Sequence, residues 1–163
     1  MGRWRPPPAA STPYITPEGY EFLERELKSL WDRRRDVTRA LAAAAAEGDR
    51  SENAEYIYRK KELREIDSRI GYLQRRLPKL TIVKQVGDRS SIFFGAWVTL
   101  EDKDRNKYEY RIVGPDEIDT HENYISIDSP MARALRGKSV GDKIILTIKT
   151  REIKYIVIEI RYT

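Results

Sequence analysis

The sequence predicts an α+β protein: an N-terminal antiparallel hairpin of two coiled-coil helices, then a C-terminal antiparallel sheet domain with one short helix. Apolar residues recur at steps of three and four in the first half, only a short stretch separates the two segments with this spacing, and the period changes to two after Ser91. The expected divisions are a disordered Pro-rich tail at 1–14, the hairpin at 15–80 with its tip near 47–53, and the sheet domain at 81–163.

The first helix is expected to begin after Thr16, because Thr is a good N-cap and Pro17 and Glu18 suit a first turn. Its apolar positions are Tyr20, Leu23, Leu27, Leu30, Val37, Leu41 and Ala44, with Arg34 interrupting the series. Those of the second helix are Leu63, Ile66, Ile70, Leu73 and Leu77. Pro78 ends or kinks that helix. Because few residues join the two segments, we expect them to pack antiparallel, with a first helix of roughly 30 residues and ~45 Å.

The second half contains five stretches that alternate or are rich in β-branched and aromatic residues, as is typical of strands. They are IFFGAWVTL, KYEYRIVG, NYISID, KIILTIK and EIKYIVIEI. Between the third and the fourth, Ser129-Pro130 followed by MARALRG predicts a short helix with a Ser N-cap.

Composition restricts the function classes. The chain has no cysteine, which excludes disulfides and thiolate metal sites and is consistent with a reducing cytoplasm. No apolar stretch approaches the ~20 residues that span a bilayer. A net charge of +5 favours an anionic partner such as nucleic acid, although only weakly, so the distribution of charge matters more than its total.

The stretch AAAAAEGDRSENAEY, residues 42–56, lies at the expected tip of the hairpin. Alanines keep helix propensity and add almost no width, which suits either a narrow channel or the close approach of two helices. Asp49 and Glu52 resemble a capping box, and Ser51 is a competing N-cap. Alternatively, two exposed carboxylates at a tip supply oxygen ligands to a cation such as Mg²⁺ and orient a water on it, with other ligands coming from a partner.

Basic residues flank this tip on both predicted helices. They are Arg33, Arg34, Arg35 and Arg39 on the first, and Arg59, Lys60, Lys61 and Arg64 on the second. This distribution suits an anionic strand running along the hairpin towards a metal. The alternative interpretation is a solvated face whose cations pair with Glu62, Glu65 and Asp67. Elsewhere, His121 is a lone histidine in a polar loop, and we expect Asp116, Glu117 and Asp119 to form a solvated turn.

Three segments resemble the bacterial Gre transcript-cleavage factors: GDRSENAEY at 48–56, YRKKELREIDSRIGYL at 58–73 and ISIDSPMARALRGKSVGD at 125–142. The second segment, together with LWDRRRDVT at 30–38, is closer to the GreB type than to the GreA type. The resemblance runs from about Ile15 to the C-terminus, and the motifs occur in the family's order in both halves.

The resemblance implies a C-terminal domain of FKBP-like fold that binds RNA polymerase, and a coiled coil that enters the polymerase's secondary channel. Asp49 and Glu52 match the two tip acids that help to hold a second Mg²⁺ of the polymerase site and to activate water. The remaining matches are Lys60 and Lys61, with Arg64 beside them, for binding the extruded 3′ RNA, and Asp128, Ser129 and Pro130 for docking on polymerase.

The function that the resemblance implies is that of an elongation factor and not of an independent enzyme. Polymerase's own centre would cut the RNA of backtracked, arrested complexes, so that elongation resumes. We expect Mg²⁺ to be held jointly with polymerase and not by the isolated protein, which would be a cytoplasmic monomer with no membrane partner and, at most, weak contact with DNA.

Three alternatives remain open at this point. Glu47 adds a third acid near the tip, and related channel-binding factors with more acids there inhibit polymerase without stimulating cleavage. The C-terminal domain is, by fold analogy, a candidate prolyl isomerase, although fold alone does not establish an activity. The positive net charge also leaves direct binding of DNA as an alternative.

Overall fold

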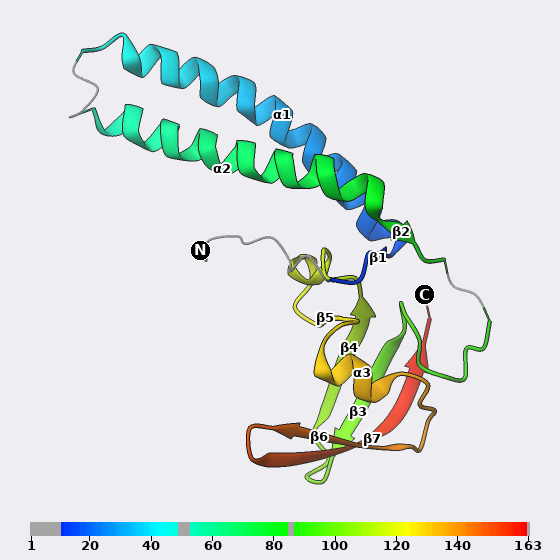
Figure 1. Cartoon of the computed structure of the whole chain (residues 1–163). Coiled ribbons are helices and arrows are strands. Elements are labelled where there is room, and N and C mark those ends of the chain that lie inside the picture. The colour runs from blue at the N-terminus through cyan, green and yellow to red at the C-terminus, as the bar shows by residue number, and fades with distance from the viewer. Residues whose placement is uncertain (1–10, 49–52, 85–86, 163) are drawn as a thin grey trace. The chain divides into compact units, whose positions relative to one another are not determined.

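The computed structural model describes residues 11–48, 53–84 and 87–162. The chain divides into two compact units: Tyr20–Lys79 forms one, and Met1–Gly19 together with Leu80–Thr163 forms the other. The predicted fold class is confirmed, because two long helices form a hairpin and the C-terminal half forms a sheet with one short helix (Figure 1).

The hairpin consists of α1 (Pro17–Ala45) and α2 (Ala54–Arg76), and the 3₁₀ turn η1 (Leu77–Lys79) follows α2 directly. The two long helices run antiparallel beside each other (Figure 1). Thr16 caps α1 as predicted, since its hydroxyl oxygen accepts a hydrogen bond from the backbone N–H of Gly19 at 3.0 Å. With 29 residues, α1 has the predicted length.

The predicted apolar positions form the contact between the two helices. Val37, Ile66 and Ile70 are the buried centre of this contact, and each contributes about 2 kcal/mol by burial. Leu27, Leu30 and Leu63 pack around them. The interruption at Arg34 has a structural role, because its Nε donates to Oδ1 of Asp67 on the other helix at 2.6 Å.

The other unit is built on a five-stranded sheet in the order β5-β4-β3-β7-β6. Its strands are β3 (Trp97–Asp102), β4 (Lys107–Val113), β5 (Tyr124–Ser126), β6 (Lys143–Ile148) and β7 (Arg151–Arg161). Three neighbouring pairs are antiparallel, but β4 and β5 are parallel. The connection between them, which contains the 3₁₀ turn η2 (Ile118–Thr120), brings the chain back to Arg111, and β5 then runs beside the last three residues of β4. Within this sheet, the expected antiparallel pairing therefore fails between β4 and β5.

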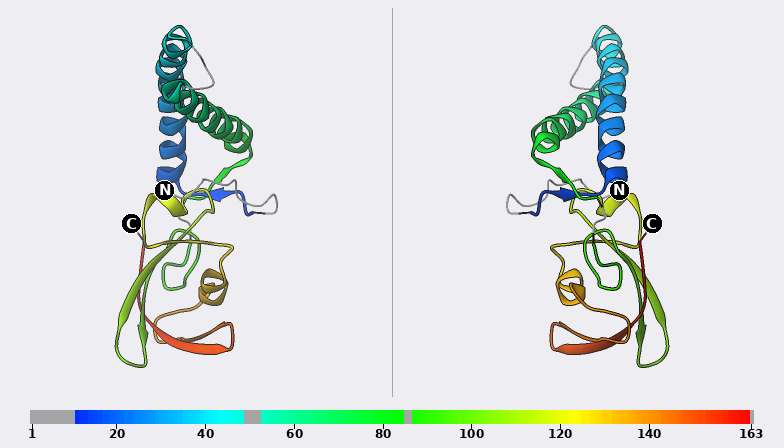
Figure 2. Two further views of the ribbon diagram at one scale, coloured as in Figure 1. Left: turned by 90° about the vertical axis from the view of Figure 1, so that its left-hand side faces the viewer. Right: turned by 90° about the vertical axis from the view of Figure 1, so that its right-hand side faces the viewer.

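The short helix α3 (Pro130–Leu135) packs on one face of this sheet (Figure 2). Ala132 and Leu135 of α3 are buried. They share one core with alternate residues of the strands, which are Val98, Leu100, Ile112, Ile144, Tyr155 and Val157. The period of two in the sequence therefore corresponds to one buried and one solvated face of the sheet.

A second, two-stranded sheet joins the N-terminal segment to the residues that follow the hairpin. It pairs β1 (Tyr14–Ile15) with β2 (Thr81–Ile82) in parallel, and Thr81 donates its N–H to the Pro13 carbonyl at 2.7 Å. Gly114 lies against β1: a Cβ on it would meet the Tyr14 carbonyl oxygen at 1.8 Å, so only glycine allows this approach. Two residues per strand are too few for a periodic signal, and the sequence did not predict this sheet.

Candidate functional site

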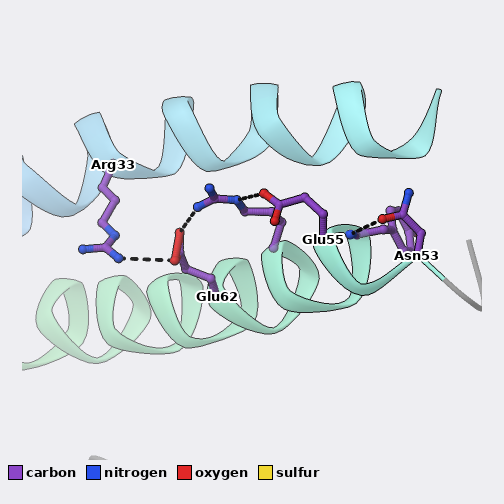
Figure 3. A network of polar contacts seen from close by, with 6 residues as sticks. Arg33, Asn53, Glu55 and Glu62 are labelled. Atoms are coloured by element: carbon purple, nitrogen blue, oxygen red, sulfur yellow. Dashed lines mark hydrogen bonds and ion pairs between the residues drawn. The ribbon is translucent and has the colours of Figure 1, made fainter. Parts of the chain in front are cut away.

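Asn53 bridges the facing ends of α1 and α2. Its Oδ1 accepts from the N–H of Tyr56 at 3.0 Å and so caps α2 (Figure 3). Its Nδ2 donates to the carbonyl of Ala44, in the last turn of α1, at 2.8 Å. The predicted capping roles of Asp49 and Ser51 are wrong, because α2 begins at Ala54 and Asn53 occupies its N-cap.

The predicted catalytic and metal-binding acids, Asp49 and Glu52, lie outside the described residues. The chain leaves α1 through Ala46 and Glu47, both of which are exposed, and reaches Gly48 in a left-handed conformation with φ of +127°. Glycine adopts this conformation without strain, which suits the sharp exit from a helix. Gly48 and Asn53 are the described residues that flank the two acids in the sequence.

We expect the bridge from Asn53 to Ala44 to hold the tip of the hairpin closed. Replacing Asn53 by Asp keeps an equally good N-cap but removes the donor to the Ala44 carbonyl. The loss of this hydrogen bond should destabilise the closed end of the hairpin by about 1 kcal/mol. Amide exchange at Glu47 and Tyr56 should then be roughly fivefold faster, since opening of this end becomes easier. Asn53→Ala, which loses both bonds, should show a larger increase, and an unchanged exchange rate in Asn53→Asp would show that the bridge contributes nothing.

Behind the tip, a chain of ion pairs connects the helices (Figure 3). Glu62 on α2 accepts from Arg33 of α1 and from Arg59 of its own helix, each at 3.3 Å. Arg59 also donates to Glu55 at 2.8 Å, and this bond raises the pKa of Arg59. For Arg33, Arg34 and Arg59, the alternative interpretation of a solvated, internally paired face is therefore correct.

The three residues predicted to bind RNA, Lys60, Lys61 and Arg64, are exposed on α2. Their spacing places them on adjoining sides of two successive turns. Among the residues that the structure describes, no carboxylate pairs with any of the three, and Lys60 Nζ lies 5.9 Å from the centre of the Tyr56 ring. In this respect the three residues differ from Arg33 and Arg59, each of which pairs with a described carboxylate.

The predicted docking residues, Asp128, Ser129 and Pro130, form the start of α3. Ser129 Oγ accepts from the N–H of Ala132 at 3.2 Å, and Pro130 is the first helical residue, as predicted for this cap. Asp128 is half-buried, and both of its carboxylate oxygens accept hydrogen bonds from Thr12: Oδ2 from the backbone N–H at 2.9 Å and Oδ1 from the hydroxyl. The sequence did not indicate this contact.

Sequence comparison assigns both halves of the chain to one family. Residues 13–82 match "Transcription elongation factor, N-terminal" (GreA_GreB_N), and residues 87–162 match "Transcription elongation factor, GreA/GreB, C-term". The chain belongs to the GreA/GreB family of transcription elongation factors. The resemblance noted in the sequence is thereby confirmed.

The similarity to relatives in this family extends over almost the whole chain. Transcription elongation factor GreB of Pseudomonas aeruginosa is 54% identical and covers 99% of this chain and 98% of its own. GreB of Xanthomonas axonopodis pv. citri is 53% identical with the same coverage, which supports the predicted GreB type. The crystal structure of Thermus aquaticus Gfh1 is 28% identical, covers 93% of this chain and 99% of its own, and has a TM-score of 0.43.

One carboxylate of this Gre-family chain was misjudged from the sequence. Glu117 does not lie in a solvated turn, since only 1% of its surface is exposed. Its Oε2 accepts from the N–H groups of Thr16 at 3.0 Å and Gly114 at 2.8 Å, and its Oε1 accepts from the Thr16 hydroxyl. Burial raises the pKa of Glu117, and these hydrogen bonds oppose the increase only in part.

His121 is likewise less isolated than the sequence suggested. Its ring stacks on Tyr124 with centroids 4.9 Å apart, and it meets the edge of Trp97 at 5.6 Å. Among the described residues of this Gre-family chain, no cluster of three or more His, Cys, Asp or Glu side chains is placed to bind a metal. No helix within the same residues is both long and apolar enough to cross a bilayer.

Proposed function

We propose that this chain is a GreB-type transcript-cleavage factor. It docks on RNA polymerase, inserts its helical hairpin into the secondary channel and stimulates Mg²⁺-dependent endonucleolytic cleavage of the 3′ RNA in backtracked, arrested complexes. The nuclease centre belongs to polymerase, and this chain activates it without being an enzyme. It acts in the cytoplasm as a monomer, and transcription resumes from the new 3′ end.

The end of the hairpin carries this proposal. A helix of 29 residues is about 44 Å long, and it ends in alanines instead of bulky side chains. Asn53 ties the start of α2 to the last turn of α1, and Asp49 and Glu52 lie between these two helices in the sequence. Lys60, Lys61 and Arg64 lie in the first three turns of α2 without carboxylate partners among the described residues.

The chemistry follows from these residue types. Mg²⁺, when bound, stabilises the charge on the attacking and leaving oxygens of a phosphodiester. Asp49 and Glu52 would supply carboxylate oxygens, the ligand type that this cation prefers. Two carboxylates do not complete its octahedral coordination, so the remaining ligands come from polymerase, the RNA phosphate and water. Because neither acid reads a base, cleavage should depend little on the RNA sequence.

The lengths of RNA released from a backtracked elongation complex test the proposal. Radiolabelled complexes stalled at one position are incubated with Mg²⁺, with and without this protein, and then supplied with nucleotides. We expect shortened RNA, short 3′ fragments and renewed extension only with the protein. Slower extension with no shortened RNA would replace the proposal by the alternative, a channel-binding inhibitor.

Lys60, Lys61 and Arg64 should hold the extruded RNA. We expect Lys60→Ala combined with Lys61→Ala to lower the cleavage rate of complexes backtracked by many nucleotides about tenfold, since two phosphate contacts are lost. Affinity for polymerase, measured by competition, should change less than twofold. Lys103→Ala with Lys107→Ala removes the same charge from exposed positions of the sheet unit and should change neither quantity. Equal losses of cleavage and affinity in the α2 variant would instead assign these lysines to docking.

A further inference from the structure

The N-terminal segment holds two carboxylates of the C-terminal half in the same way. Thr16 donates its backbone N–H at 3.0 Å and its hydroxyl to the two oxygens of Glu117. Four residues earlier, Thr12 donates its backbone N–H at 2.9 Å and its hydroxyl to the two oxygens of Asp128. Thr16 and Glu117 are 101 positions apart in the sequence, and Thr12 and Asp128 are 116 positions apart. Strand β1 lies between the two threonines.

The two contacts differ in their surroundings. The Thr16–Glu117 contact is buried at the start of α1, where its structural purpose is clear. The Thr12–Asp128 contact is only part-buried. Asp128 directly precedes Ser129, which is half-buried, and Pro130, which is exposed. A structural role alone does not require a charged, bidentate contact at that place, because Ser129 already caps α3.

We propose that Thr12 is a positioning residue for polymerase docking, which sets the orientation of the Asp128 carboxylate. This inference rests on the proposed function, in which Asp128 is part of the docking segment. A carboxylate has about four acceptor positions, and Thr12 occupies one on each oxygen. The remaining positions stay available to N–H or cationic donors of a partner, in a fixed direction.

Local sequence explains why Thr12 can make both bonds. Pro13 follows it and restricts Thr12 to an extended conformation. The carbonyl of Pro13 accepts from Thr81 at 2.7 Å, and the carbonyl of Ile15 accepts from Val83 at 2.9 Å, so the segment is held against β2 immediately after Thr12. The N–H and hydroxyl of Thr12 are therefore already held against Asp128 before polymerase binds. Docking then needs little further ordering of this carboxylate, which lowers the entropy cost of binding.

Cleavage of a backtracked complex, titrated with the full-length protein, tests this role. Thr12→Val keeps the shape and the backbone bond but removes the hydroxyl, so we expect the half-saturating concentration to rise roughly fivefold. The maximal cleavage rate and the melting temperature should stay unchanged. Thr12→Ser should restore the wild-type concentration. Thr120→Val removes an exposed threonine hydroxyl that donates to the Glu117 carbonyl, and it should leave the half-saturating concentration unchanged.

Asp128→Asn separates failure of this inference from failure of the proposed docking site. If Asp128→Asn leaves the half-saturating concentration unchanged, docking through Asp128 is wrong. If Asp128→Asn raises it but Thr12→Val does not, only the role of Thr12 is wrong. When both substitutions raise it, the double variant should be no weaker than Asp128→Asn, since Thr12 acts through that carboxylate. Tighter binding by Thr12→Val would mean that Thr12 competes with polymerase for Asp128, which also overturns the proposal.

Discussion

Neutralising both tip acids, with Asp49→Asn and Glu52→Gln together, should lower stimulated RNA cleavage at least about 100-fold at saturating protein. Amides keep the size of the carboxylates but lose the negative charge that makes them ligands for Mg²⁺, and a metal stabilises the transition state by several kcal/mol. The measurement is the rate at which shortened RNA appears from a stalled complex. Affinity for polymerase, measured by competition, should stay within twofold of wild type.

The chain provides a matched control for this substitution. Glu47 is exposed two residues after α1 ends at Ala45, and Glu47→Gln removes one nearby negative charge in the same way. It should leave the cleavage rate within about twofold of wild type. If the doubly neutralised protein cleaves as fast as wild type, Asp49 and Glu52 do not carry the chemistry. If Glu47→Gln is as damaging as the double variant, the negative charge of the whole tip matters more than these two acids.

Removing the carboxylate of Glu117 should have the largest effect on stability. Glu117→Ala leaves the N–H groups of Thr16 and Gly114 and the Thr16 hydroxyl without their acceptor in a buried site. We expect the free energy of unfolding to fall by about 3 kcal/mol or more, because each unsatisfied buried donor costs about 1–3 kcal/mol. Urea denaturation followed by circular dichroism measures this change.

Glu117→Gln is the control, since its amide oxygen can still accept from the two N–H groups. Burial raises the folded-state pKa of Glu117 above its unfolded value. The folded protein therefore binds this proton more tightly, and the associated stability is full below the unfolded pKa and is lost as the pH rises through the folded pKa. Wild type should accordingly gain stability relative to Glu117→Gln as the pH falls. A difference that is independent of pH would show that Glu117 has the same pKa in both states.

The hairpin could be predicted from the sequence because its contacts follow a local rule. Steps of three and four place Val37, Ile66 and Ile70 on facing sides of two helices, whatever else the chain does. The strands and α3 were predicted for the same reason, since alternation and a Ser-Pro cap are local signals. The parallel pairing of β4 with β5 was not, because the direction of a strand depends on the connection that precedes it.

In the candidate site, too, features with a local sequence signal could be predicted, and contacts between distant residues could not. Motif resemblance indicated Asp49, Glu52, the α2 cations and the docking segment from short runs of sequence. The distant partners of Asn53, Glu117 and Asp128 could be found only from the fold, because Ala44, Thr16 and Thr12 lie 9, 101 and 116 residues away from them. A carboxylate between Asp116 and Asp119 gives no local sign that it is buried, so Glu117 was predicted to be solvated.

The N-terminal segment that carries β1 has a consequence for synthesis of the chain. Thr16 and Thr12 leave the ribosome first, but their acceptors, Glu117 and Asp128, are made about 100 residues later. The hairpin of α1 and α2 can form early, whereas the sheet unit is complete only when both ends of the chain have been made. A fragment that starts at residue 80 lacks strand β1 and both threonines, and would expose the backbone N–H of β2 and the Glu117 carboxylate to water.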